Sequence, residues 1–557
     1  MMDFCPIINA TMELKDCADR WFIDEKYDCW CLEDVLYTPA ATAPLFQRLS
    51  IFVPRAYMSA PGVINHAAAF GRYTADTAPI VFENNAAGYM QMPHTWLGGP
   101  RNYAEQYLRH GLIYVTSGCR GRETPEGKAP ATLVDLKTAI RFLRHNRAAL
   151  PGCFDRVISV GWSAGGAMSS LLAVTGDNAA YLPLLEKNGA FMDESDAVYA
   201  AQIYCPIIDL EHADLAYEWC FAADRDCENS PAGPAETMTP FKEALSAELS
   251  RRYVGYINAM GLKDPETGAP LTLTEDGRGG SFYDYQMACL NKAAAKFLSL
   301  LGQADAPLKC SPEDYLAGHY TRLTEAPREH HDGPPAMHHA GPGVVLPTEQ
   351  PRRPMGLGEM MLRPPKGTPF HEMKPEMVEV PGTAKPWLTW DGREARISNL
   401  DEYVLNHRRR MKPCTSFDKL TNDSGENEEF GNVEQGFVHF DPIIGEAIAA
   451  IADRFPEEAA RYQAAYEGCM SPELAERVRL LNPLSFIGTG EKSNQAKHYR
   501  IRVGASDADT SLSVAMTLAL RLQNAGCGSV DYALVWDQPH SEADYPGEVL
   551  DWIDGIC

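Results

Sequence analysis

The chain has 557 residues, of which 45% are hydrophobic and 22% are charged, values that are ordinary for a globular protein with a large core. Its 75 acidic and 50 basic residues give a formal net charge of −25. A field of this sign repels the phosphate backbone of nucleic acids and anionic membrane surfaces, so neither is expected as a partner.

The N-terminal segment, residues 1–21, lacks the basic start and apolar core of a signal peptide, and no run of about 18 apolar residues occurs anywhere in the chain. The 15 cysteines include no Cys-x-x-Cys pair, and only Cys29 and Cys31 are closely spaced. This pattern is typical of scattered thiols in a reducing compartment. We therefore expect a cytoplasmic protein without a metal site and without a cofactor.

Short apolar runs alternate with helical patterns between residues 49 and 205. Such alternation predicts an α/β fold with a mostly parallel central sheet that is covered on both faces. The expected strands are LSIFVP (49–54), APIVFE (78–83), LIYVTSG (112–118) and RVISVG (156–161), and the expected helix is LVDLKTAIRFLRHN (133–146).

The alternation stops after residues 201–214 and resumes only near the C-terminus, so the stretch between is predicted to be an insertion between two core strands. The resumed elements are expected at 498–523, 529–536 and 543–553, and helical patterns inside the insertion lie at 240–260, 285–302 and 443–481. Residues 327–391 are rich in Pro, Gly, Met and His without a period, which predicts a long irregular loop. The predicted parts are a core segment at 1–209, an inserted domain at 210–485 and a second core segment at 486–557.

The segment VISVGWSAGGAMSS (157–170) places Ser163 between a β-branched run and a helix of small residues. The pentapeptide from Gly161 to Gly165 fits G-x-S-x-G, in which the serine sits in a strained turn and the flanking glycines avoid collisions with neighbouring backbone. The strand before it and the helix after it supply the context that this motif needs. We interpret Ser163 as a nucleophile rather than as a small residue in a structural turn.

A serine hydroxyl needs a base, and the order Ser…Asp…His predicts that the base lies late in the chain. His540 lies between the last expected strand and the terminal helix, where this fold brings a base over the elbow. The remaining histidines are interpreted as surface or structural residues, among them His145, His212, His407 and His439. The pairs His330-His331 and His338-His339 lie in the irregular loop without carboxylate or thiolate partners, so they do not predict a metal site.

The segment RIRVGASDADTS places Asp507 and Asp509 at the carboxyl edge of the sheet, upstream of His540. We expect Asp507 to orient the histidine. The alternative is that both aspartates only cap a helix beginning near Thr510, a role for which Asp509 is well placed. The other rivals for the acid are Asp209 and Asp537.

An acyl-transfer site also needs backbone donors for the oxyanion. The N–H group of Ala164 follows the nucleophile and supplies one donor. The small-residue loop ENNAAGYM (83–90) is able to bring the N–H group of Ala87 or Gly88 alongside, although the same composition also suits an ordinary turn.

In these motifs the chain resembles bacterial tannase, an α/β-hydrolase family that hydrolyses gallate esters. The resemblance runs from about residue 50 to the end of the chain, and its most specific parts are DLEHADLAYEW, ENEEFG and DADTS. The matching stretches are NAAGYM, GWSAGGAMSSLLAVTGDN, PIIDLEHADLAYEW (206–219), KPCTSFD…GENEEFGN (412–432), IRVGASDADTS and WDQPHS.

The resemblance implies an α/β-hydrolase fold with a large inserted lid domain, no cofactor and a role for each matching residue. By resemblance, Ser163, Asp507 and His540 form the triad, and Lys412, Glu426 and Asp509 hold the galloyl hydroxyls. Ala164 and the Ala87/Gly88 loop match backbone contacts to the acyl group, and Ile207 lies beside the ring. Without the resemblance, Lys412 would be interpreted as a solvated charge and Glu426 as an acidic residue of a loop. The insertion is longer than the family's lid, chiefly through residues 327–391, so the alcohol part of the substrate is not predicted.

The motifs and the resemblance suggest three possible functions, and the expected partner is a small phenolic ester. The leading hypothesis is a serine esterase that cleaves galloyl or protocatechuoyl esters through an acyl-enzyme. The second keeps the triad but acts on feruloyl or simple carboxylic esters. The third is a catalytically silent hydrolase fold used for binding, and the presence of all three triad positions argues against it. No propeller repeat marks a prolyl peptidase.

Overall fold

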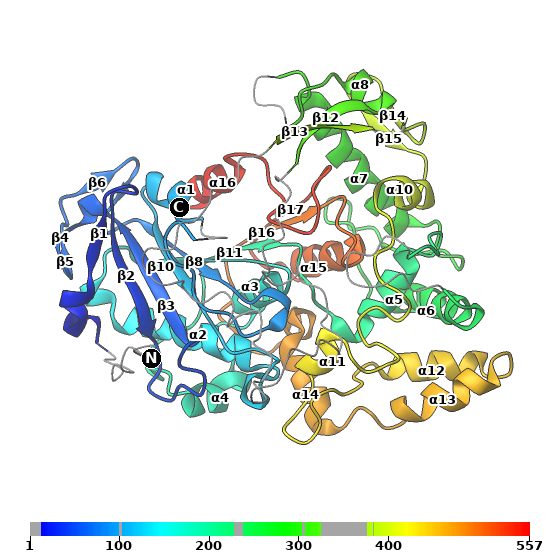
Figure 1. Ribbon diagram of the computed structural model, residues 1–557, viewed down its shortest axis with the longest axis horizontal. Helices are drawn as coiled ribbons and strands as arrows, with labels where there is room; N and C mark the ends of the chain where they lie inside the picture. Colours follow the sequence, from blue (N-terminus) through cyan, green and yellow to red (C-terminus); the bar gives the residue numbers. More distant parts are fainter. Residues whose placement is uncertain (1–12, 100–102, 228–237, 304–306, 325–375, 382–383) are drawn as a thin grey trace, which may run out of the picture.

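The computed structural model describes residues 13–99, 103–227, 238–303, 307–324, 376–381 and 384–557 (Figure 1). A nine-stranded sheet lies at its centre, in the order β1-β2-β3-β9-β8-β10-β11-β16-β17. The strands are β1 (Phe22–Asp24), β2 (Cys29–Leu36), β3 (Arg48–Pro54), β8 (Pro79–Asn84), β9 (Ile113–Ser117), β10 (Cys153–Trp162), β11 (Ala200–Tyr204), β16 (His498–Gly504) and β17 (Ser529–Val535).

The sheet is mostly parallel, as the alternating pattern predicts. All pairs from β9 to β17 are parallel, whereas β1, β2, β3 and β9 pair antiparallel. In Figure 1, α1 and α16 lie above the sheet, and α2 and α4 lie below it. The helices of the core are α1 (Ala104–Arg109), α2 (Ala131–His145), α3 (Ala164–Val174), α4 (Leu182–Lys187), α15 (Leu512–Asn524) and α16 (Glu548–Ile556). The α/β-hydrolase prediction is confirmed.

Two expected boundaries near the C-terminus are wrong. The last helix begins at Glu548 instead of near residue 543, because Gly547 precedes it in the left-handed conformation, with φ 85°. Helix α15 begins at Leu512, and its N-cap is Ser511, whose side chain accepts a hydrogen bond from the N–H group of Ser513. Asp509 is therefore not the cap of this helix.

The strands β11 and β16 are parallel neighbours in the sheet although residues 205–497 separate them in sequence. The intervening chain lies to one side of the sheet, on the right of Figure 1. We call residues 210–485 the insertion, keeping the bounds expected from the sequence. Its helices are α5 (Leu210–Cys220), α6 (Pro240–Ala259), α7 (Ser281–Leu300), α8 (Pro312–Ala317), α10 (Leu400–His407), α11 (Gly425–Glu429), α12 (Pro442–Ile451), α13 (Pro456–Tyr466) and α14 (Pro472–Leu481).

Two expectations inside the insertion need correction. The helical pattern at 443–481 forms three helices, because Pro456 and Pro472 each begin a new one. Residues 376–381 and 388–390, expected to be irregular, are strands whose partners lie outside the predicted loop. The strands are β12 (His319–Thr324) with β13 (Glu376–Pro381), and β14 (Leu388–Trp390) with β15 (Ala395–Ile397). Residues 325–375, with both histidine pairs, lie outside the described residues.

One continuous hydrophobic core joins the sheet to the insertion. It contains Ile158 and Val503 from the sheet together with Trp219, Leu249 and Ile448 from insertion helices, all of them buried. The insertion is therefore packed onto the core by apolar contacts and is not a tethered appendage. Within the described ranges, no helix combines the length and the apolarity that a membrane crossing requires.

Candidate active site

Ser163 occupies the sharp turn between β10 and α3. Its backbone has φ 59° and ψ −126°, a conformation that costs energy for any residue other than glycine. The N–H group of Ser163 donates to the carbonyl of Tyr204 at 3.1 Å, and the carbonyl of Ser163 accepts from Ile207 at 3.2 Å. These bonds to the end of β11 and to the segment after it hold the strained turn in place. Strained residues of this kind cluster at functional sites.

Asn84, at the end of β8, clamps the same turn. Its side-chain amide donates to the carbonyl of Val160 at 3.0 Å and to the carbonyl of Gly165 at 3.1 Å. Gly161 must be glycine here, because a Cβ atom would collide with the carbonyl of Gly165 and with the amide of Asn84. The strand, turn and helix around Ser163 thus have the geometry that G-x-S-x-G requires.

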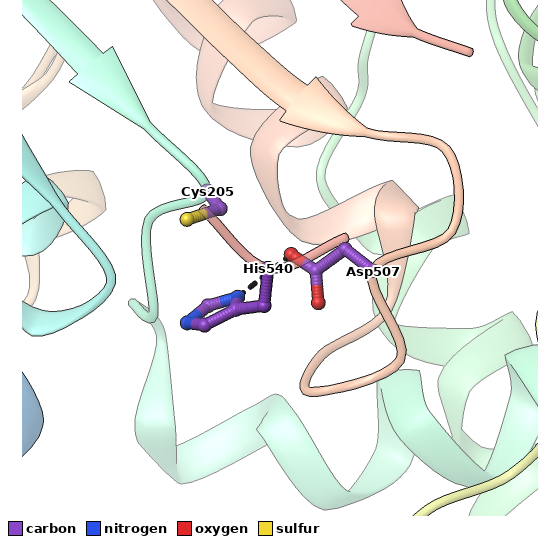
Figure 2. A group of neighbouring side chains, drawn as sticks. All are labelled: Cys205, Asp507 and His540. Atoms are coloured by element: carbon purple, nitrogen blue, oxygen red, sulfur yellow. Dashed lines mark hydrogen bonds and ion pairs between the residues drawn. The ribbon is translucent and has the colours of Figure 1, made fainter. Parts of the chain in front are cut away.

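Asp507 and His540 lie in two loops that meet at the carboxyl edge of the sheet. The Nδ1 atom of His540 is 2.8 Å from the Oδ2 atom of Asp507, whose side chain is fully buried (Figure 2). The loop of His540 comes this close because Gly504, at the end of β16, has no Cβ atom to collide with the carbonyls of Gln538 and Pro539. The backbone N–H group of Asp509 donates a hydrogen bond to the other carboxylate oxygen of Asp507, Oδ1, at 2.9 Å. The carboxylate is therefore fixed from two sides.

The charge of His540 depends on its carboxylate neighbours. Burial alone would lower the pKa of His540, but the negative charge of Asp507, its hydrogen bond and the charge of Asp509 raise that pKa well above its usual value. Asp509 lies farther away, with its Oδ2 atom 4.0 Å from Nδ1. A histidine with a raised pKa holds a proton strongly, which favours an imidazolium formed during catalysis.

Of the described carboxylates, Asp507 is the one hydrogen-bonded to His540. The rival Asp209 instead faces His212 at 2.9 Å and accepts from Tyr256 at 2.5 Å. The other rival, Asp537, follows β17 with φ 62°. The histidines expected to be structural are engaged elsewhere: His145 with Glu13, His212 with Asp209, His407 stacked on Trp536, and His439 with Asp418.

Cys205 is a third side chain beside this pair, and the sequence patterns did not single it out. It follows β11 directly, has φ 34°, and is fully buried. Its thiol interacts with the ring of His540 and with the backbone N–H group of Ser163. The thiol therefore lies beside both the elbow and the histidine. Its only sequence signal is its place at the carboxyl end of a parallel strand.

Two groups of backbone N–H donors flank Ser163. Ala164 is the first residue of α3, and the first N–H groups of a helix have no acceptor within the helix. The loop after β8 forms the short 3₁₀ helix η3 (Ala87–Tyr89), which packs against α3 and has Gly88 at φ 60°. The small-residue loop expected from the sequence thus lies next to the elbow.

Lys412 and Asp509 come together from different parts of the chain. The Nζ atom of Lys412 donates to the backbone carbonyl of Asp509 at 2.7 Å and is 3.7 Å from its carboxylate. Burial alone would raise the pKa of Asp509, but positive charges at His540, Lys412 and Arg408 lower it below its usual value. Asp509 is therefore an anion beside both the histidine and the lysine, and Lys412 is not a solvated surface charge.

Glu426 and Ile207 are both linked to Tyr89. Glu426 belongs to α11, which packs against η3, and its charge acts on Tyr89. The hydroxyl of Tyr89 donates to the carbonyl of Ile207 at 2.6 Å. Arg122 ties the two short helices together, because its guanidinium donates to the carbonyl of Gly88 at 2.9 Å and pairs with Glu428 of α11.

Two buried side chains of α5 hold the segment that carries Lys412. The hydroxyl of Tyr217 accepts from the backbone N–H of Lys412 at 2.9 Å and donates to the carbonyl of Ala508 at 3.2 Å. The carboxylate of Asp214 accepts from three successive N–H groups, those of residues 416–418. The sequence pattern marks both only as members of a helix, since their partners lie far away in sequence.

Arg408 makes the most direct link between the insertion and the triad loop. Its guanidinium is fully buried and donates to the backbone carbonyls of Asp507 and Thr510. The loop that orients His540 is therefore braced by a residue of the insertion. Asp507, His540, Asp509 and Lys412 thus lie together after the end of β16, and Glu426 belongs to α11, which packs on η3 next to α3.

Comparisons with known proteins agree with this arrangement. The BD-FAE family model, an α/β-hydrolase family, matches residues 96–218. Comparison with curated sequences gives no match. The chain is similar to the tannin acyl hydrolase of Lactobacillus plantarum, with 29% identity, TM-score 0.71, and coverage of 97% of this chain and 98% of that one.

Two further structures give similar values. For the tannase of Fusobacterium nucleatum the identity is 26%, the TM-score is 0.69 and 95% of each chain is covered. For a tannin acyl hydrolase in complex with ethyl gallate the identity is 28%, the TM-score is 0.68, and the match covers 95% of this chain and 94% of that one.

The sheet, the strained elbow and the aspartate–histidine pair define the chain as an α/β-hydrolase of the carboxylic ester hydrolase class. Within that class its near-full-length structural similarity is to the bacterial tannases, so it is a tannase-like hydrolase.

Proposed function

We propose that this chain is a serine esterase that hydrolyses galloyl and protocatechuoyl esters through an acyl-enzyme intermediate. One observation carries the proposal: the charged pair Lys412–Asp509 lies directly beside the Asp507–His540 pair. A carboxylate and an ammonium group next to a candidate triad suit an acyl group that bears acidic hydroxyls.

In the proposed mechanism Ser163 attacks the ester carbonyl while His540 takes its proton, and Asp507 keeps the ring in the correct orientation. The N–H group of Ala164, with that of Ala87 or Gly88, stabilises the oxyanion. His540 then protonates the leaving alcohol, and a water molecule that His540 activates releases the acid. The strain at Ser163 and the buried hydrogen bond of Asp507 support these roles.

Three charged side chains are proposed to read the ring hydroxyls: Lys412, Glu426 and Asp509. The carboxylates accept hydrogen bonds from phenolic hydroxyls, and the ammonium group donates to one. Ile207 is proposed to lie against the ring face. Support comes from the similar tannin acyl hydrolase in complex with ethyl gallate. A ring without hydroxyls would leave these charges unpaired, which opposes its binding.

The insertion is proposed to act as the lid of this site, with bounds at 210–485. It carries Lys412 and Glu426, and Arg408 fastens it to the triad loop. A cytoplasmic location is proposed as well, because the cysteines within the described residues are free thiols, which suit a reducing compartment.

The test compares hydrolysis of methyl gallate, methyl ferulate and p-nitrophenyl acetate by the purified chain, together with fluorophosphonate labelling of wild type and Ser163→Ala. We expect methyl gallate to exceed methyl ferulate by ~10⁴-fold or more in kcat/KM, because unpaired buried groups discriminate at that level. Labelling should depend on Ser163. Preference for ferulate would instead identify a feruloyl esterase, indifference to the ring a general carboxylesterase, and absence of labelling a silent binding fold.

A further inference from the structure

The loops after β11, β16 and β17 bring three metal-ligating side chains to one point. Cys205, Asp507 and His540 each offer a ligand atom, and the three atoms lie within 4.8 Å of one another (Figure 2). Asp507 and His540 have proposed roles in the reaction, but the thiol has none in that mechanism. Besides its contacts with His540 and with the N–H group of Ser163, it makes a long hydrogen bond to the carbonyl of Ser541, at 3.4 Å.

The ligand set is one that thiophilic cations accept. Zn²⁺ binds thiolate sulfur, imidazole nitrogen and carboxylate oxygen in tetrahedral sites, and three protein ligands leave a fourth position for water. The softer ion Cd²⁺ and the borderline ion Co²⁺ also use thiolate and imidazole ligands. Cys205 and Asp507 are fully buried, whereas 17% of the His540 side chain is exposed. The donors are thus held on one rigid edge of the sheet, with an opening at the histidine.

We propose that Cys205, Asp507 and His540 form an inhibitory site for a thiophilic divalent cation such as Zn²⁺. A cation held there occupies the imidazole that must take the proton of Ser163, so the ester cannot be attacked. The inhibition rests on the proposed role of His540 as the base. The binding of the metal does not, because it depends only on the donor atoms.

Coordination converts the Cys205 thiol to a thiolate. The S–H bond breaks, the sulfur lone pair forms the bond to the metal, and the proton leaves to solvent. The imidazole nitrogen that binds the metal must also be free of a proton, so any proton on it is released to solvent as well. The proposed site is inhibitory and is not a cofactor site: the proposed ester cleavage uses no metal, and it stops when the sulfur and the imidazole share a cation.

The test measures p-nitrophenyl acetate hydrolysis during titration with ZnCl₂, with reversal by EDTA, in wild type and Cys205→Ser. Loss of the sulfur ligand should weaken inhibition by at least the roughly 10–100-fold that follows removal of an outer-shell partner. A matched control is Cys31→Ser, since the Cys29 and Cys31 sulfur atoms lie 3.5 Å apart and offer a second thiol pair. The control should be inhibited like wild type.

Titration with CoCl₂ gives a readout that needs no turnover. Wild type and Cys31→Ser should develop the thiolate-to-cobalt charge-transfer band, and Cys205→Ser should not. The band is also recorded in the double variant Cys31→Ser/Cys205→Ser, which lacks the second thiol pair. Inhibition that is unchanged in Cys205→Ser, or a band that persists in the double variant, overturns the site. A band that depends on Cys205 without any inhibition by Zn²⁺ overturns the inhibitory role and argues against His540 as the base. If the wild-type chain shows no esterase activity, the cobalt titration still decides whether the metal binds at Cys205.

Discussion

The core and the insertion place their functional side chains by different means. In the core, Ser163 follows β10 directly, and Asp507 and His540 lie in short loops after β16 and β17 that hydrogen bonds hold in place. In the insertion, Lys412 lies on an irregular segment that is fixed by buried polar side chains such as Tyr217 and Asp214. The difference separates two proposed tasks: the core supplies the groups proposed to cleave the ester, and the insertion supplies Lys412 and Glu426, two of the three groups proposed to bind the ring hydroxyls.

The two regions meet at the loop from Asp507 to Thr510. Asp507 faces the histidine, Asp509 faces Lys412, and Arg408 of the insertion donates to the backbone carbonyls of Asp507 and Thr510. A change in Ser163, Asp507 or His540 should therefore affect every ester equally. A change in Lys412 or Glu426 of the insertion, or in Asp509 of the core loop that contacts Lys412, should affect mainly esters with ring hydroxyls.

The largest effect is expected when the proposed catalytic residues of the core are replaced. Ser163→Ala or His540→Ala should each lower kcat by ~10⁴-fold or more on both methyl gallate and p-nitrophenyl acetate, and the double variant should cost little more because the triad acts as one unit. Steady-state kinetics measure this. Ser170→Ala, in the same buried helix, serves as the control and should keep wild-type activity. Losses that multiply in the double variant would contradict a shared mechanism.

The next effect tests the ring-reading groups. Asp509→Ala should lower kcat/KM for methyl gallate by about 10–150-fold, the equivalent of a hydrogen bond to a charged group. Hydrolysis of p-nitrophenyl acetate should change much less, because Asp507 and His540 keep their bond. The two esters are compared at alkaline pH, where the histidine is neutral in both proteins. Equal losses on both would make Asp509 a part of the triad.

A smaller effect is expected where α5 supports the insertion. Asp214→Asn leaves one of the three N–H groups at 416–418 facing an amide instead of a carboxylate oxygen, so the Lys412 segment should loosen. We expect kcat/KM for methyl gallate to fall about tenfold, the equivalent of one weakened hydrogen bond. The ratio of the two esters measures it. The exposed Asp423→Asn is the control, and an unchanged ratio in Asp214→Asn would remove the proposed support.

The smallest effect is a displacement of the pH profile. His540 acts as a base only when neutral, and its pKa is raised, so kcat/KM should fall as the pH falls through a value above 6.5. Asp509→Asn removes one charge that raises this pKa, and the acid limb should move to lower pH. The shift is measured from pH profiles of p-nitrophenyl acetate hydrolysis by the wild type and Asp509→Asn, with Asp423→Asn as the control. A limb that moves upward would show that Asp509 does not act on the histidine as a negative charge.

Local patterns were sufficient for the core because its signals are local. The elbow around Ser163 is a contiguous pentapeptide with a strand before it and a helix after it, and Asp507 and His540 each follow an expected strand, β16 and β17. The strands β1 and β2 escape prediction, since β2 carries the adjacent acids Glu33 and Asp34 at an irregularity in its pairing with β3. A pattern of alternating faces is lost at such a point.

The insertion was less predictable because its contacts are remote. Asp214 is a buried acid whose partners begin at residue 416, and in a helix such an acid has the same pattern as a solvated one. Cys205 contacts His540 only because three strand ends converge, and a single cysteine after a strand has no motif. The positions of Lys412 and Glu426 came from family resemblance, not from spacing. When the partners of a side chain lie far away in sequence, they can be identified only from the folded structure.

The separation of β11 from β16 in sequence also affects how the chain folds during its synthesis. During synthesis β11 emerges as the open edge of an unfinished sheet, with its hydrogen-bonding groups unpaired, and edges of this kind invite pairing with other chains. At ~5–20 residues per second, translation of residues 205–497 takes roughly 15–60 s before the partner strand exists. Through that interval the nascent chain carries its candidate nucleophile without an acid or a base. The strands β16 and β17 therefore both close this edge of the sheet and bring the proposed acid and base to the candidate nucleophile.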